Sequence, residues 1–135
     1  MSQENVGLAR RAIEAALHTP KPDFATMNEL YHPEHEFISL VDALEGDRHI
    51  GGRGYRDWLV GAGEAVAWES SLEAIREVDD ERVVAVMRMR GEGVSSGVPW
   101  EQPHACLMTI RDGKVVRTLV YPSFEDALKA VGLAE

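Results

Sequence analysis

The side chains best suited to chemistry lie in one run of residues, 99–111, in the C-terminal half of the chain. Successive side chains of a β-strand point to opposite faces, so every second residue of an extended run shares a face. One face of this run would then carry an indole, an amide, an imidazole, a thiol and a thioether, which belong to Trp100, Gln102, His104, Cys106 and Met108. A mostly apolar face with a few polar groups is typical of the wall of a small-molecule pocket.

His104 is the candidate catalytic residue of this face. A neutral imidazole is a general base, and an apolar wall lowers the pKa of the ring and keeps it neutral. The alternative is a half-buried histidine that hydrogen-bonds to the backbone or to Gln102. Cys106 faces the same way, but residues two apart on a strand are ~6.5 Å from each other, and a Cys–His pair needs direct hydrogen-bond contact. We therefore expect Cys106 to line the pocket as a small apolar group.

His32 and His35 suggest a metal pair, but the pattern around them is poor. Pro33 breaks helical spacing between the two histidines, and a catalytic zinc site needs a third protein ligand. Glu36 would point away from His35 on a strand. We therefore expect a solvated turn here, with no metal and no other cofactor.

Two arginines on a neighbouring run, Arg88 and Arg90, could clamp a carboxylate. Met87 and Met89 alternate with them on the opposite face. We expect the methionines to point inward and the arginines to lie on the outer face. Aromatic residues from elsewhere in the chain are expected to help close the pocket, namely Phe37, Tyr55 and Trp58.

The elements that position these residues are predicted to be helices first and long strands afterwards. Apolar residues recur at helical spacing after Ser2. Asp23 is expected to cap a second short helix, which Pro33 stops. A third helix is expected from about Arg53 to Ala67. The predicted strands are 36–41, 72–78, 82–90, 99–111 and 115–121, with an Asp112-Gly113 hairpin turn. Ser123 caps a short C-terminal helix.

This order predicts an α+β fold in a single domain, residues 1–135. We expect a cone-shaped, curved antiparallel (mixed) sheet whose one face is closed by the three N-terminal helices. Both faces of run 99–111 carry apolar residues: Met108 and Ile110 on one, Ala105 and Leu107 on the other. Since the second face also needs a cover, we expect a homodimer formed through the outer sheet face.

Composition narrows the class of partner. The 135 residues carry 14 Lys and Arg against 23 Asp and Glu, a net charge of −9. That charge repels phosphate backbones and anionic membrane surfaces, so neither nucleic acid nor a membrane is an expected partner. The one cysteine excludes an internal disulfide and suits a reducing compartment. We expect a cytoplasmic protein.

The order of elements and four segments resemble a known family. The segments are LYHPEHEF (30–37), GYRDW (54–58), MTIRDGKVVR (108–117) and FEDALKAVGL (124–133). Together they resemble SnoaL-like proteins, part of the nuclear-transport-factor-two-like or ketosteroid-isomerase-like superfamily. This resemblance implies the cone fold, which hosts isomerases, cyclases, epoxide hydrolases, dehydratases and non-catalytic binders.

The resemblance also says where the family's acids would fall. The isomerase branch uses an Asp base with an oxyanion hole of Tyr and a protonated Asp, and the base position corresponds to Ser39. The hydrolase and cyclase branches have an acid on the final strand before an aromatic residue, and Val120 stands there before Tyr121. Neither family acid is present at its position in this chain.

Three functions follow as hypotheses. The first is a protein that binds a small, largely apolar molecule in the conical pocket. The second is an enzyme of isomerase, cyclase or hydratase type with His104 as general base and Gln102 or Tyr55 polarising a carbonyl or holding water. The third is an interaction protein whose interior is filled.

Overall fold

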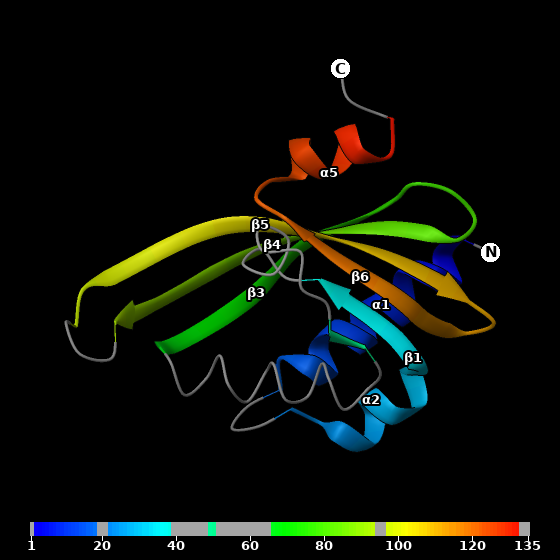
Figure 1. The fold of residues 1–135 in the computed structure, drawn as a ribbon, viewed down its shortest axis with the longest axis horizontal. Coiled ribbons are helices and arrows are strands. Elements are labelled where there is room, and N and C mark those ends of the chain that lie inside the picture. The colour runs from blue at the N-terminus through cyan, green and yellow to red at the C-terminus, as the bar shows by residue number, and fades with distance from the viewer. Residues whose placement is uncertain (1, 19–21, 39–48, 51–65, 94–96, 133–135) are drawn as a thin grey trace.

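The computed structural model describes residues 2–18, 22–38, 49–50, 66–93 and 97–132. Within these residues the helices are α1 (Ser2–Ala16), α2 (Phe24–Leu30) and α5 (Phe124–Ala130). Its strands are β1 (Tyr31–Ile38), β2 (His49–Ile50), β3 (Val66–Glu77), β4 (Arg82–Gly93), β5 (Pro99–Arg111) and β6 (Lys114–Tyr121). The predicted α+β class is confirmed, with long strands following the N-terminal helices (Figure 1).

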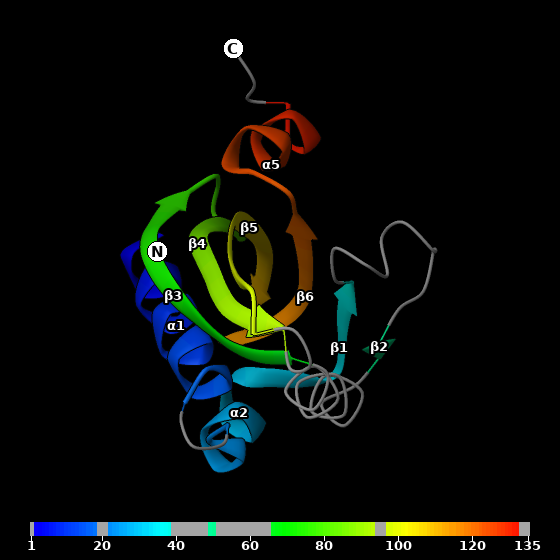
Figure 2. The ribbon, with the colours of Figure 1, turned by 90° about the vertical axis from the view of Figure 1, so that its left-hand side faces the viewer.

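The strands form one mixed sheet in the order β2-β1-β6-β5-β4-β3. β1 runs parallel to β6, and the other neighbours are antiparallel. The sheet is strongly curved, and α1 and α2 lie on one side of it while α5 lies beyond the other (Figures 1 and 2). We call the side toward α1 and α2 the inner face and the side toward α5 the outer face.

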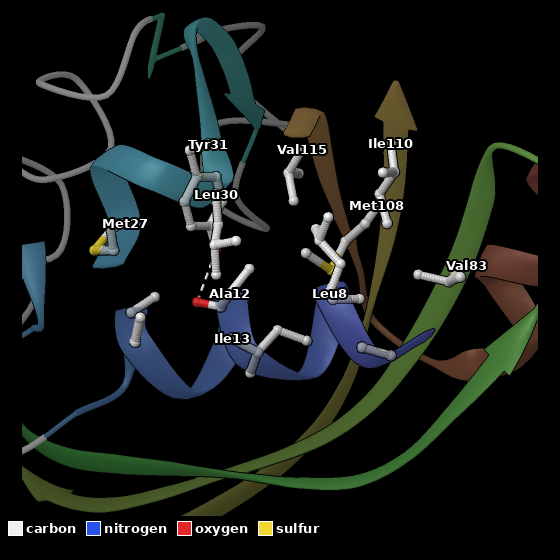
Figure 3. Close-up of a cluster of buried hydrophobic side chains, with 14 of the residues drawn as sticks. Leu8, Ala12, Ile13, Met27, Leu30, Tyr31, Val83, Met108, Ile110 and Val115 are labelled. Atoms are coloured by element: carbon white, nitrogen blue, oxygen red, sulfur yellow. Dashed lines mark hydrogen bonds between the residues drawn. The ribbon is translucent and has the colours of Figure 1, made fainter. Parts of the chain in front are cut away.

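The inner face supports the larger hydrophobic core. Val83, Met108 and Ile110 of the sheet pack with Leu8 and Ile13 of α1 (Figure 3). The Tyr31 hydroxyl donates a hydrogen bond to the Ala12 carbonyl across 3.2 Å, so the start of β1 is tied to the first helix. Burial of this apolar surface is the main force holding the helices on the sheet.

The outer face has a core of its own, which corrects one step of the dimer argument. Val84, Ala105 and Leu107 are buried with Ala127 of α5. Ser123 caps that helix by accepting a hydrogen bond from the Asp126 N–H at 3.1 Å, as predicted. The chain therefore covers Ala105 and Leu107 itself, and they no longer require a second subunit. The homodimer stays a prediction.

Several predicted boundaries are wrong. The second helix ends at Leu30, because Tyr31 begins β1, and Pro33 lies within that strand instead of after a helix. Val66 and Ala67, expected at the end of a third helix, form the start of β3. The remainder of that expected helix, like residues 39–41 of the expected first strand, lies outside the described residues. Among the described residues no helix has the length and apolar character needed to cross a membrane.

The β5–β6 hairpin turn confirms the Asp-Gly prediction. Arg111 pairs with Lys114, and the two residues between them have positive φ, 52° for Asp112 and 75° for Gly113. Positive φ at both central residues is the requirement of a type I′ turn, whose twist matches that of the strands.

Two glycine-to-alanine substitutions separate this backbone requirement from side-chain contact. A Cβ added at Gly113 or at Gly7 of α1 would meet no atom within 4 Å. Gly113→Ala should lower the free energy of unfolding by about 1 kcal/mol, because left-handed backbone is unfavourable for alanine. Gly7→Ala should raise it by up to about 1 kcal/mol, because alanine favours a helix. Urea denaturation measures both, and two changes of the same sign would contradict the backbone argument.

Candidate functional site

His104 lies at a boundary on the inner face. Two positions further along β5, Cys106 packs against the inner core cluster. Two positions beyond that, Met108 is a member of the cluster and is 1% exposed. Two positions before His104, Gln102 is exposed. His104 itself is 6% exposed, so its ring stands where the closed core gives way to accessible surface.

The His104 imidazole is a neutral group with a free ring nitrogen. Burial lowers the pKa of His104, and hydrogen bonding to the backbone of Gln102 opposes this shift. Its Nδ1 atom is buried and has no hydrogen-bond partner among the described residues. A neutral imidazole in this state can accept or donate one hydrogen bond, or take up a proton.

Two sulfur-containing residues neighbour His104 in the sheet. Met87 of β4 pairs directly with His104 across the ladder, and Cys106 follows on the same face. Burial raises the pKa of the Cys106 thiol to about 12. The thiolate is the reactive form of cysteine, so this burial disfavours thiol chemistry and favours the apolar role expected of Cys106.

For His35 the sequence prediction gave the wrong environment. It lies in β1, is 0% exposed, and its Nε2 is 2.8 Å from the Thr118 hydroxyl of β6. Its ring also meets Tyr31 edge to face, with centroids 4.8 Å apart. The expected solvated turn is therefore wrong at His35. Alternation with Phe37 on the same strand face was a usable signal, but Pro33 concealed the strand.

His35 and His104 belong to different parts of the inner face. Thr118, the partner of His35, is paired with Met108 in the β5–β6 ladder. His104 precedes Met108 by four positions, which is ~13 Å along a strand. The two imidazoles are therefore not one site. His35 ties β1 to β6 inside the core, whereas His104 lies toward accessible surface.

The other sequence candidates fall in different places. Phe37 and Met108 are members of the inner core cluster, and Gln102 lies on the same strand face as His104. Trp100 pairs with Gly91 in the β4–β5 ladder. Tyr55, Trp58 and Ser39 lie outside the described residues.

No group of three His, Cys, Asp or Glu side chains within the described ranges could hold a metal ion. His32 makes a local contact, in which its Nδ1 accepts a hydrogen bond from the Glu34 N–H at 2.9 Å. Its ring nitrogen therefore serves the backbone of the same strand.

The predicted orientation of the β4 side chains, methionine inward and arginine outward, is confirmed for Met87 and Arg88. Met87 is buried in the inner core cluster, and Arg88 faces outward between two carboxylates. The Arg88 guanidinium lies 2.8 Å from Glu101 and 3.3 Å from Glu73, so it already has anionic partners from both neighbouring strands. An exposed pair of this kind contributes little stability. The outer face thus holds no open carboxylate clamp at Arg88.

Comparison with known protein families identifies one family that matches most of the chain. The model of the SnoaL-like domain family matches residues 9–118. No curated protein matches the chain significantly. The chain therefore belongs to the SnoaL-like domain family.

Solved structures agree on the fold. A putative SnoaL-like polyketide cyclase from Jannaschia sp. CCS1 is 18% identical, with a TM-score of 0.75 over 99% of this chain and 94% of that one. A hypothetical protein with a ketosteroid isomerase-like fold from Catenulispora acidiphila DSM 44928, in complex with trimethylamine, is 14% identical, with a TM-score of 0.70 over 93% of this chain and 92% of that one. TerC, co-crystallised with polyporic acid, is 16% identical, with a TM-score of 0.73 over 96% and 97%.

Val120, which the resemblance aligned with an acid of the cyclase and hydrolase branches, is apolar and faces inward. Val120 pairs with Cys106 and packs against the inner core cluster. An aliphatic side chain at this position cannot transfer a proton. His104 lies on the same face, two positions before Cys106 along β5.

The buried imidazole of His35 makes stability depend on pH. Burial lowers the pKa of His35 from 6.5 to about 4. The unfolded chain therefore binds a proton below pH 6.5 that the folded chain does not bind until about pH 4. Stability present above pH 6.5 is lost as the pH falls through this window, by about 3 kcal/mol in all.

The measurement is urea denaturation of the wild type and His35→Gln at pH 7, 5.5 and 4. The wild type should lose more stability on acidification than the variant, because glutamine does not titrate. His32→Gln, a change at the more exposed histidine, serves as the control and should follow the wild type. Equal pH slopes for wild type and His35→Gln would contradict the assignment.

Proposed function

We propose that this protein is a cytoplasmic binder of a small, largely apolar molecule, held against the inner face of the sheet around His104. The observation that carries the proposal is the free Nδ1 of a neutral, buried imidazole at the boundary between packed core and accessible surface. A buried polar atom without a partner is costly, and proteins usually satisfy it. A bound molecule would supply the missing hydrogen bond.

The surroundings of His104 support an apolar ligand. Met87, Cys106 and Val120 lie beside it on the same face. Thioethers, a protonated thiol and an aliphatic side chain offer dispersion contact and no charge. This matches the usual composition of small-molecule sites, in which an apolar lining surrounds a few orienting polar groups. Two relatives by fold carry small molecules in their structures, which is consistent with this use of the fold.

The binding proposal is tested by a thermal-shift and native mass-spectrometry screen with steroid-like, terpenoid and polyketide-like compounds. At least one class should stabilise the protein. His104→Phe keeps a ring of similar size without its nitrogens, and it should weaken the best compound about tenfold, the worth of one hydrogen bond. Stabilisation by no class, or equal affinity for wild type and His104→Phe, would contradict the proposal.

An enzyme of isomerase, cyclase or hydratase type is the second candidate. The same observation favours it, because a neutral imidazole with a free nitrogen is the form in which histidine acts as a general base. Compounds that bind are incubated with the protein and followed for products by mass spectrometry. If turnover occurs, His104→Phe should lower kcat by about 10²- to 10⁴-fold. Turnover that survives this substitution would assign the proton transfer to another group.

A further inference from the structure

A second buried polar atom on the inner face lacks a partner. The hydroxyl oxygen of Ser70 in β3 is buried and makes no hydrogen bond within the described part of the chain. Ser70 shares its strand face with Leu72, which packs against the inner core cluster. The neighbouring Ser71 shows the opposite arrangement, since it is exposed and its hydroxyl donates to the Arg88 carbonyl at 3.5 Å. Strand alternation therefore turns Ser70 inward.

The ladders fix the position of Ser70 relative to His104. Ser70 pairs with Met89, which pairs with Gln102. On the next inward-facing level, Leu72 pairs with Met87, which pairs with His104. Ser70 and His104 are thus separated by two strand spacings across the sheet and by two residues along the strands. Strand geometry sets them about 10 Å apart across the sheet and about 7 Å along it, or about 12 Å between Cα atoms.

The inward-facing side chains between Ser70 and His104 are two methionines, Met87, which is buried, and Met89, which is partly exposed. Met87 and Met89 both face inward from β4, the strand between the two anchors. Thioether sulfur is polarisable and makes favourable contacts with aromatic rings. The side chains at these two levels carry no charge among the described residues: Ser70, Leu72, Met87, Met89, Gln102 and His104. A charged ligand would lose its hydration here without gaining a counter-charge.

We propose that Ser70 and His104 are the two polar anchors of one ligand, an uncharged planar aromatic molecule with a hydroxyl or carbonyl group at each end, lying across Met87 and Met89. The inference rests on the proposed binding function and adds to it a second anchor and a ligand class. Ser70 is a hydroxyl that can donate and accept, and His104 can do either through Nδ1. Each end of the molecule therefore gains a hydrogen bond that the protein does not provide.

Rigid two-ring probes test this arrangement directly. Biphenyl-4,4′-diol has hydroxyls at both ends, 4-phenylphenol has one, and biphenyl-4,4′-dicarboxylate replaces both by charges. Isothermal titration calorimetry should show the diol binding about fivefold to tenfold more tightly than 4-phenylphenol, the gain from one hydrogen bond. The dicarboxylate should show no binding at the same concentrations.

Ser70→Ala and Ser71→Ala form a matched pair of variants. Ser70→Ala should remove the advantage of the diol over 4-phenylphenol, whereas Ser71→Ala should keep it. Folding is checked by the melting temperature without ligand. Ser70→Ala should melt at or above the wild-type temperature, because it deletes a buried hydroxyl that has no partner to lose.

Two results would overturn the inference without affecting the binding proposal. One is equal affinity of wild type for the diol and 4-phenylphenol. The other is the same ligand preference in Ser70→Ala and Ser71→Ala. Failure of all three probes to bind would remove the ligand class proposed here, while the compound screen with His104→Phe decides separately whether the protein binds apolar molecules at all.

Discussion

The alternation of side chains along the β4–β5 ladder is the constraint on which the structure depends. Val83 and Met87 face the N-terminal helices, and Val84 faces α5. A shift of one residue in the register of a strand would exchange its two faces, which for β4 would place the Arg88 guanidinium in the inner core. The two apolar cores on opposite sides of the sheet therefore allow only one register between β4 and β5. In that register His104 pairs with Met87.

This constraint explains why much of the fold could be predicted. The long run 99–111 and the Asp112-Gly113 turn were correct, because period-two alternation and turn chemistry are local properties. The inward placement of Met87 follows from the same alternation. The expectation that Ala105 and Leu107 need a second subunit to cover them was wrong. The packing of α5 on the outer face is a tertiary contact that no local pattern specifies. That contact determines whether an apolar face needs another subunit.

The site was predictable only in part, for a related reason. His104 stood out because its strand was recognised, and its burial and neutral state follow from where that strand lies. His35 and Ser70 were missed because each lies near an element boundary that the sequence obscured. Pro33 concealed the beginning of β1, and β3 begins at Val66, within a stretch that reads as helical. A residue's face is known only when the start of its strand is known.

The parallel pairing of β1 with β6 has a consequence for how the chain assembles. The His35–Thr118 contact joins residues 83 positions apart, and Lys114 donates from the start of β6 to the Glu29 carbonyl, 85 positions away. Closing such long loops is entropically costly and slows folding. On the ribosome, the first helices and β1 emerge long before the strand against which β1 pairs. Their apolar sides therefore stay exposed until nearly the whole chain has been synthesised.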